Sequence, residues 1–117
     1  MTFTNAGRNE VRDWLAGVSA TAPNSIGVGT GTTSATVNDT ALGTEVFRQT
    51  ITAVTSPFLA MFEMVMTTVD ATGSSLSEFG LFNNTTGSGD MFLRNTFAPV
   101  DKTSAIEIQF ESRVEID

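Results

Sequence analysis

The strict alternation of apolar and polar residues at the end of the chain is the feature that most restricts its fold. Between residues 106 and 116, polar or charged side chains occupy every odd position, and apolar side chains occupy every even position except Ser112. A period of two is that of a β-strand with one buried and one hydrated face. A register shift of one residue would bury a row of charges, so the pattern predicts a strand with a well-defined register.

Five other segments also have strand-like composition. They are 26–28, 46–55, 57–69, 76–82 and 91–98. The turn-forming residues 83–90 lie between the last two segments and predict a hairpin. The polar, Gly- and Thr-rich segment 29–38 predicts a long surface loop.

The segment 57–69 differs from the other predicted strands because both of its faces are apolar. One face carries Phe58, Ala60, Phe62, Met64 and Met66, and the other carries Leu59, Met61, Val65 and Val69. A strand that is apolar on both faces is expected to be covered on both. We therefore predict that the helix or a neighbouring subunit packs against it.

One segment near the start of the chain has helical periodicity. Its apolar residues, spaced i, i+3, i+4 and i+7, are Val11, Trp14, Leu15 and Val18. Thr4 or Asn5 is suited to cap the start, and Gly17 is suited to end the helix. These features predict a helix over about 5–16, with its apolar stripe against one end or face of a sheet and Trp14 in the core.

Together the elements predict a single domain over residues 1–117. The fold class is mainly β: a small antiparallel β-sandwich, jelly-roll or immunoglobulin-like, with strands from about residue 26 to 116 and one short N-terminal helix.

The composition argues against several functions. The chain contains neither His nor Cys, which removes the commonest general base and thiol chemistry. Its formal net charge is −7 and Lys102 is its single lysine, so we expect no nucleic-acid partner. No apolar run is long enough for a membrane-spanning helix, so we expect no membrane insertion. No signal peptide is recognisable, so we expect the chain to be made in the cytoplasm.

Each motif that could bind a ligand or catalyse a reaction is better interpreted as a structural or solvent-exposed segment. The glycine-rich segment 27–33 lacks the Lys and the following helix of a phosphate-binding loop. Four aspartates at predicted turns lack calcium-loop spacing and are interpreted as solvated turn residues: Asp39, Asp70, Asp90 and Asp101. Glu107, Glu111 and Glu115 are interpreted as the hydrated face of the last strand. We therefore predict no catalytic, cofactor-binding or metal-binding residues, no cofactor, and no enzymatic activity.

The apolar residues of segment 57–69 instead suggest assembly. The predicted assembly surface consists of Phe58, Phe62, Met64 and Met66, and the residues predicted to lie on exposed loops are Thr30, Thr32, Thr33, Asn83 and Asn84.

An ordered set of short segments resembles a known family. The segments are Thr4–Arg8, Trp14–Gly17, Gly27–Thr33, Thr40–Arg48, Ser77–Asn83, Met91–Arg94 and Phe97–Lys102, followed by the long alternating strand. In this order, and over almost the whole chain, they resemble small β-rich structural proteins from the virions of tailed bacteriophages and related archaeal viruses.

The resemblance implies a non-enzymatic virion subunit of the tail, tail-fibre or baseplate region, made in the host cytoplasm. Two alternatives remain at this point: a decoration protein on the capsid, and a receptor- or glycan-binding module that uses the polar loops. The expected partners are further copies of the chain, with a trimer as one candidate oligomer, and other virion proteins.

Overall fold

The computed structural model describes residues 2–86 and 89–115. Within these residues it contains eight strands and one helix. They are β1 (Thr2–Phe3), α1 (Asn5–Leu15), β2 (Ser25–Gly29), β3 (Glu45–Thr50), β4 (Ala53–Ser56), β5 (Leu59–Met66), β6 (Ser75–Phe82), β7 (Met91–Asp101) and β8 (Ile108–Glu115).

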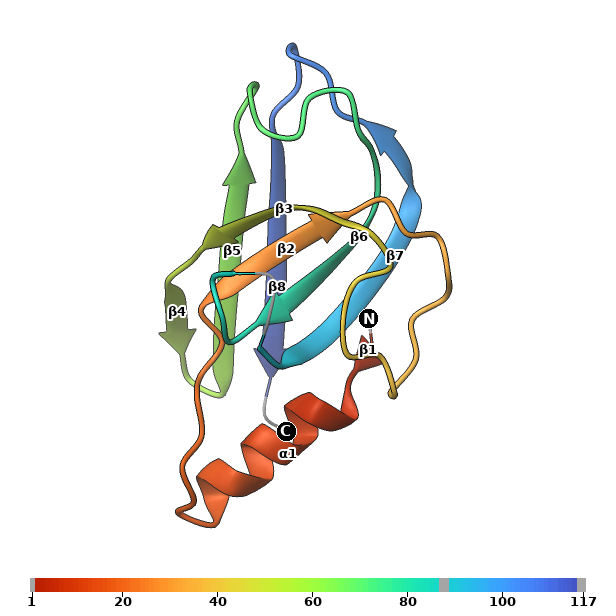
Figure 1. Ribbon diagram of the computed structural model, residues 1–117. Helices are drawn as coiled ribbons and strands as arrows, with labels where there is room; N and C mark the ends of the chain where they lie inside the picture. The colour runs from red at the N-terminus through yellow and green to blue at the C-terminus, as the bar shows by residue number, and fades with distance from the viewer. Residues whose placement is uncertain (1, 87–88, 116–117) are drawn as a thin grey trace.

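The strands form two antiparallel sheets that pack face to face (Figure 1). The larger sheet has the order β1-β7-β6-β2-β3, and the smaller has the order β4-β5-β8. The predicted mainly-β, sandwich-like fold with an N-terminal helix is confirmed. The predicted hairpin is also present, because β6 and β7 pair directly on either side of residues 83–90.

The chain crosses between the sheets three times, through residues 51–52, 67–74 and 102–107. The prediction of one strand over 46–55 was wrong, because the first crossing divides it into β3 and β4, which belong to different sheets. Ile51 is partly buried against the core at this corner, and its N–H donates to the carbonyl of Asn24 at 2.9 Å. The strand β1 was not predicted, since a two-residue strand leaves no periodic signal.

The core lies between the two sheets, and the last strand contributes to it as its alternation predicts. Phe110 and Ser112 of β8 are buried, whereas the intervening Glu111 is exposed. The ring of Phe110 lies 5.2 Å from the ring of Phe79 on β6, which joins the two layers. Ile116, the last apolar residue of the pattern, lies outside the described residues.

The faces of β5 differ from the prediction for segment 57–69. Phe62, Met64 and Met66 are at most 6% exposed and face the larger sheet, so they are core residues and do not form a surface for assembly. The opposite face remains at the surface, where Val65 is 44% exposed. One apolar face is enough to complete the sandwich, and the other face is partly covered, since Leu59 and Met61 are half-buried.

The helix has the predicted bounds and caps. Thr4 is the N-cap and its side chain accepts the N–H of Gly7 at 3.0 Å, while Gly17 follows the C-cap with a φ of 73°. Only the first turn packs closely on the sheet. A Cβ on Gly7 would lie 2.7 Å from the backbone of Phe92 on β7, so this glycine permits the close approach.

Candidate functional site

The apolar stripe of α1 is at the surface, contrary to the prediction that it covers a sheet. Trp14 is 71% exposed and Leu15 is 73% exposed, and Val11 and Val18 are exposed as well. The placement of Trp14 in the core was therefore wrong. The reason is geometric: α1 is anchored at Gly7, and its later turns extend past the end of the sandwich (Figure 1).

A groove of about 670 Å³ lies beside this stripe. Val11 and Trp14 form its helical wall, Thr55 and Ala60 of the β4–β5 hairpin contribute to its lining, and Phe92 of β7 also lines it. The remaining lining residues are Glu10 and the segment 20–23. Most of these groups are apolar, and the volume lies in the range of binding pockets.

Phe58 is another exposed apolar residue, and it belongs to the β4–β5 hairpin that contributes Thr55 and Ala60 to the groove. It occupies the turn between Thr55 and Ala60, and its side chain is 76% exposed. Its φ is 65°, a left-handed conformation that is unfavourable for a bulky residue. Strained residues of this kind occur preferentially at functional sites. Phe58 is thus the one residue of the predicted assembly surface that the structure leaves at the surface.

Glu10 of α1 holds in place the segment 20–23, which follows the helix in the sequence and forms one wall of the groove. Its carboxylate accepts the N–H of Thr21 at 3.0 Å and the side-chain N–H of Asn83 at 3.3 Å. The pKa of Glu10 lies above its ordinary value, first because its carboxyl group shares a hydrogen bond with Asp90, an effect that the N–H of Thr21 partly offsets. These bonds connect the helix, the segment 20–23 and the β6–β7 hairpin, so the groove is preformed.

A second, polar centre lies away from the groove, at the glycine-rich loop between β2 and β3. Glu78 of β6 is fully buried beneath this loop. Its carboxylate accepts the N–H groups of Gly31, Gly43 and Thr44 at 2.7, 2.8 and 2.9 Å. These three backbone amides, among them that of Gly31 in the glycine-rich segment 27–33, therefore bind a carboxylate of the same chain.

Arg94 of β7 completes this network, which we call the Glu78 network: Glu78, Arg94, Asp39 and the three loop amides. Its Nη2 lies 2.9 Å from Glu78 Oε1, and its Nη1 lies 3.0 Å from Asp39 Oδ2. Burial alone would raise the pKa of Glu78, but the loop N–H groups and Arg94 outweigh it, so the pKa is lowered. The pKa of Asp39 is also lowered, because burial is outweighed by hydrogen bonds from Thr36 and by Arg94.

Three glycines let the loop approach Glu78. A Cβ on Gly29 or on Gly31 would lie 2.5 Å from Glu78 Oε2, and a Cβ on Gly43 would lie 3.1 Å from the Cα of Gly31. Sequence reasoning did not identify Glu78 or Arg94 as important. The residues of the network come from four segments that are distant in the sequence, 27–33, 40–48, 77–83 and 91–94, and no local pattern connects them.

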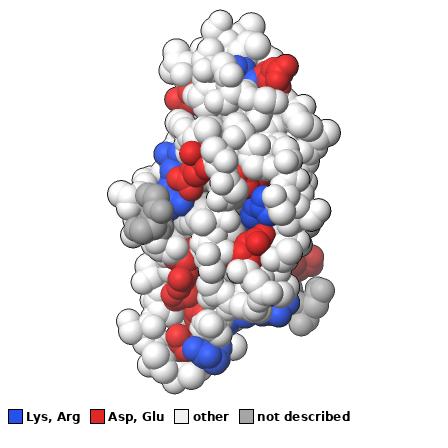
Figure 2. All heavy atoms as spheres, turned by 45° about the vertical axis from the view of Figure 1, so that its right-hand side comes forward, with Lys and Arg blue, Asp and Glu red and all other residues white. Residues whose placement is uncertain are grey.

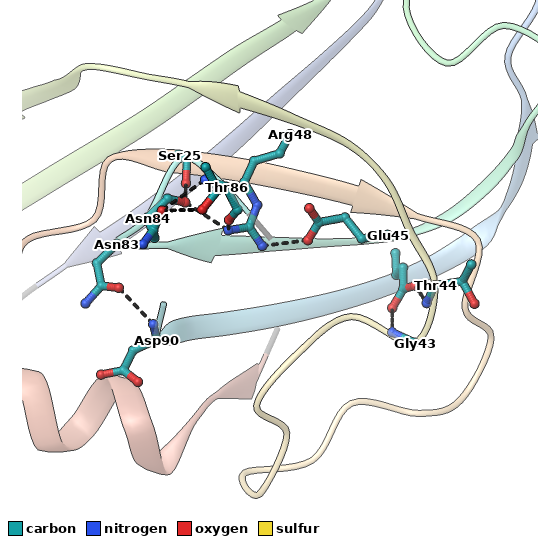
Figure 3. Close-up of polar contacts among 10 residues, drawn as sticks. Ser25, Gly43, Thr44, Glu45, Arg48, Asn83, Asn84, Thr86 and Asp90 are labelled. Carbon is teal, nitrogen blue, oxygen red and sulfur yellow. Dashed lines mark hydrogen bonds and ion pairs between the residues drawn. The ribbon is translucent and has the colours of Figure 1, made fainter. Parts of the chain in front are cut away.

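The β6–β7 hairpin loop is tied to β3 by Arg48 (Figure 3). The guanidinium of Arg48 donates to the carbonyls of Asn84 and Thr86, and its Nη2 lies 2.6 Å from Glu45 Oε1. The same guanidinium stacks 3.6 Å above the ring of Phe82, a favourable cation–π contact.

The residues predicted to lie on exposed loops fall into two groups. Thr32 and Thr33 are exposed as predicted, and Thr30 is half-buried. Asn83 and Asn84 are half-buried and serve the structure: Asn83 Oδ1 accepts the N–H of Asp90, and Asn84 Oδ1 accepts the N–H of Thr86 (Figure 3).

The prediction that four aspartates lie at solvated turns holds for some of them and not for others. Asp70 accepts the N–H of Thr67 as a turn residue, and Asp39 does the same for Thr36. Asp39 has the additional role of binding Arg94, which its interpretation as a solvated residue did not include. Asp101 lies at the end of β7, so its assignment to a turn was wrong.

The charged surface contains no large patch of one sign on the face shown in Figure 2, where acidic and basic side chains lie beside one another. Among residues 2–86 and 89–115, no three acidic side chains are grouped so that they could hold a metal ion. The helix α1, which is the one helix among these residues, is not long and apolar enough to cross a membrane. Comparisons with protein-family models, curated proteins and solved structures found no match.

Proposed function

We propose that this protein is a non-enzymatic structural subunit of a tailed-virus particle, repeated in the tail, fibre or baseplate region. The observation that carries the proposal is the apolar surface at the helix end, where Trp14 and Leu15 are exposed beside a groove with mostly apolar lining. Monomeric soluble proteins rarely expose large apolar patches, and such patches mark interaction sites. The ordered resemblance of the sequence to small virion proteins supports the same function.

The rest of the molecule suits a repeated building block. The sandwich and the Glu78 network hold the long loop and the sheets in one arrangement, while the apolar surface is available at one end. In a symmetric particle each copy uses the same patch, so modest contacts add up to a stable assembly.

The test is to find the protein in purified particles. Particles from a culture that carries the gene are separated into heads and tails, and each fraction is analysed by mass spectrometry. We expect the chain in the tail fraction at many copies per particle. Its presence on tail-less heads would instead identify a capsid decoration protein, and its absence from both fractions would contradict the proposal.

A receptor-binding module is a second candidate, favoured by one observation. Thr32 and Thr33 are exposed on a loop whose two legs are fixed by Glu78, so their hydroxyl groups are presented on a rigid scaffold. Replacing both with Asp should reduce adsorption to host cells and leave particle assembly intact. Unchanged adsorption would exclude this use of the loop.

A further inference from the structure

We propose that β8 pairs with β8 of a second copy of this chain, antiparallel about a two-fold axis at Ser112, so that the smaller sheets of two copies become one continuous sheet. The inference deepens the proposed function, on which it rests for its biological context, by naming one contact between the repeated subunits. Three observations carry it: the open edge of β8, the order of the charges along it and the groove beside it.

The strand β8 is the longer of the two edges of the smaller sheet. It pairs with β5 over its whole length of eight residues, and the order β4-β5-β8 places it at the edge (Figure 1). The opposite edge, β4, has four residues. No strand of the described residues pairs with the other side of β8. Unpaired N–H and C=O groups make such an edge a template for a further strand, and folded proteins usually keep their edge strands short.

The charges of β8 are self-complementary in the proposed register. Glu111 and Arg113 lie on the exposed face of the strand, where they form an ion pair within the chain. With the axis at Ser112, Glu111 of each copy lies directly opposite Arg113 of the other, so two cross-strand pairs of opposite charge form. In the same register Gln109 lies opposite Glu115, and no like charges meet. A two-fold interface requires this kind of self-complementarity.

Neighbouring registers lose this match. An axis at Glu111 would place the two Glu111 carboxylates opposite each other, and an axis at Arg113 would do the same for the two guanidinium groups. An axis at Phe110 would pair only residues 108–112 within β8, whereas an axis at Ser112 pairs residues 109–115. The charges and the length of the strand therefore favour the same register.

Within one chain, the neighbour of Glu111 on β5 does not balance its charge. The residue directly opposite Glu111 is Glu63, and like charges in this position are destabilising. The residue opposite Arg113 is Met61, which carries no charge. A second β8 would place a guanidinium on the open side of each Glu111, so the pairing supplies a compensation that the sheet of one copy lacks.

A groove of about 330 Å³ lies beside this edge, between β7 and β8. Its mostly apolar lining includes Phe97 and Val100 of β7, and Ile108 and Phe110 of β8. Val100 is 40% exposed, and Phe97 and Ile108 are half-buried. In the proposed register Val114 of the partner, which lies on the inward face of its strand, comes opposite Phe110. The added strand would therefore cover apolar groups that a single sandwich leaves open.

Disulfide trapping tests the register directly, because the chain has no native Cys. Gln109→Cys and Glu115→Cys are prepared separately, mixed and oxidised. Directly opposed residues of antiparallel strands have Cα atoms about 4.5–5.5 Å apart, a separation that a disulfide spans. The disulfide between positions 109 and 115 should be the main product, because 109–109 and 115–115 pairs would join opposite ends of the paired segment.

The control for trapping is Thr55→Cys, an exposed position on the opposite edge strand β4. Mixed with Gln109→Cys and oxidised, it should give little cross-linked product. A predominant 55–109 disulfide would show that β8 pairs head-to-tail with β4 of the next copy, and this would overturn the inference.

The mass and the charge pattern are tested by light scattering and sedimentation equilibrium. The wild-type chain should have twice the mass of the 12.4 kDa monomer. Glu111→Arg places like charges at both cross-strand pairs and should weaken the dimer roughly tenfold. The double variant Glu111→Arg with Arg113→Glu keeps the net charge, restores opposite charges across the axis and should associate like the wild-type chain. Circular dichroism verifies that all variants are folded.

The outcomes separate this inference from the proposed function. A wild-type chain that is monomeric at all concentrations or trimeric, predominant 109–109 or 115–115 cross-links, or a double variant as weak as Glu111→Arg would overturn the inference. Detection of that same chain in tail fractions would still support the proposed function. A dimer cross-linked between positions 109 and 115 supports the inference even if the chain is missing from particles.

Discussion

The loop between β2 and β3 and the helix α1 both differ from what their composition predicts, and they differ in opposite directions. The glycine- and threonine-rich loop looks like a flexible surface segment, yet it covers a fully buried glutamate that its own amides satisfy. The helix has an apolar stripe typical of a packed helix, yet Trp14 and Leu15 are exposed. The loop has its partner within the chain. The exposed stripe of the helix has no such partner among the described residues, and under the proposed function its partner is another subunit.

The largest effect should come from breaking the Glu78 network. Glu78→Gln removes the charge that faces Arg94, which is almost fully buried, and leaves that guanidinium poorly compensated. We expect a loss of about 3–5 kcal/mol in the free energy of unfolding, measured by urea denaturation. Glu111→Gln, which breaks the more exposed pair with Arg113, is the control and should cost about 0–1 kcal/mol. Equal losses in the two variants would contradict the importance of the network.

A smaller loss should follow from blocking the approach of the loop. Gly31→Ala places a Cβ about 2.5 Å from Glu78 Oε2, so either the loop or the carboxylate must move. We expect a cost of about 1–3 kcal/mol, as for other overpacked sites. Ser34→Ala in the exposed part of the same loop should change the unfolding free energy by about 0.5 kcal/mol or less. A tolerated Gly31→Ala would show that the loop is less closely held than the contacts indicate.

Low pH should reduce the free energy of unfolding, because it protonates Glu78 and Asp39 of the Glu78 network. Both carboxyl groups have lowered pKa values in the folded chain, so their stabilisation is present above their ordinary values of 4.5 and 3.8 and is lost as the pH falls through the folded values. Glu10 has a raised pKa and contributes with the opposite sign, since its contribution is lost as the pH rises. Unfolding titrations between pH 7 and 3 should therefore show a shallower acid loss for Asp39→Asn than for the wild-type chain. Identical pH profiles would refute this assignment.

The smallest effect on folding should come from the helix end. Trp14→Ala removes an exposed side chain, so the unfolding free energy of the monomer at low protein concentration should change by about 0.5 kcal/mol or less. Phe62→Ala, which empties a buried site on β5, should cost about 3–5 kcal/mol. If copies of the chain associate through this surface, Trp14→Ala should also lose the concentration dependence of the melting temperature that self-association confers. A large loss in the dilute monomer would mean that Trp14 is needed for the fold itself.

Local patterns predicted much of the fold and little of its polar centre. The alternation of β8, the bounds of α1 and the β6–β7 hairpin follow from rules that operate over a few residues, and the structure confirms them. Glu78 was missed because its partners are distant in the sequence. Gly31 lies 47 residues before it, and no local pattern distinguishes a buried glutamate from an exposed one on an apolar strand.

The sequence by itself determined the helix α1, the β6–β7 hairpin, the mainly-β class and the inward face of the last strand, because periodicity and capping depend on neighbouring residues. Only the tertiary structure decided that β3 and β4 separate into different sheets, that the amides of the glycine-rich loop hold Glu78, and that the stripe of α1 stays exposed. Each of these outcomes depends on which distant surfaces meet, and that is set by the packing of the whole chain.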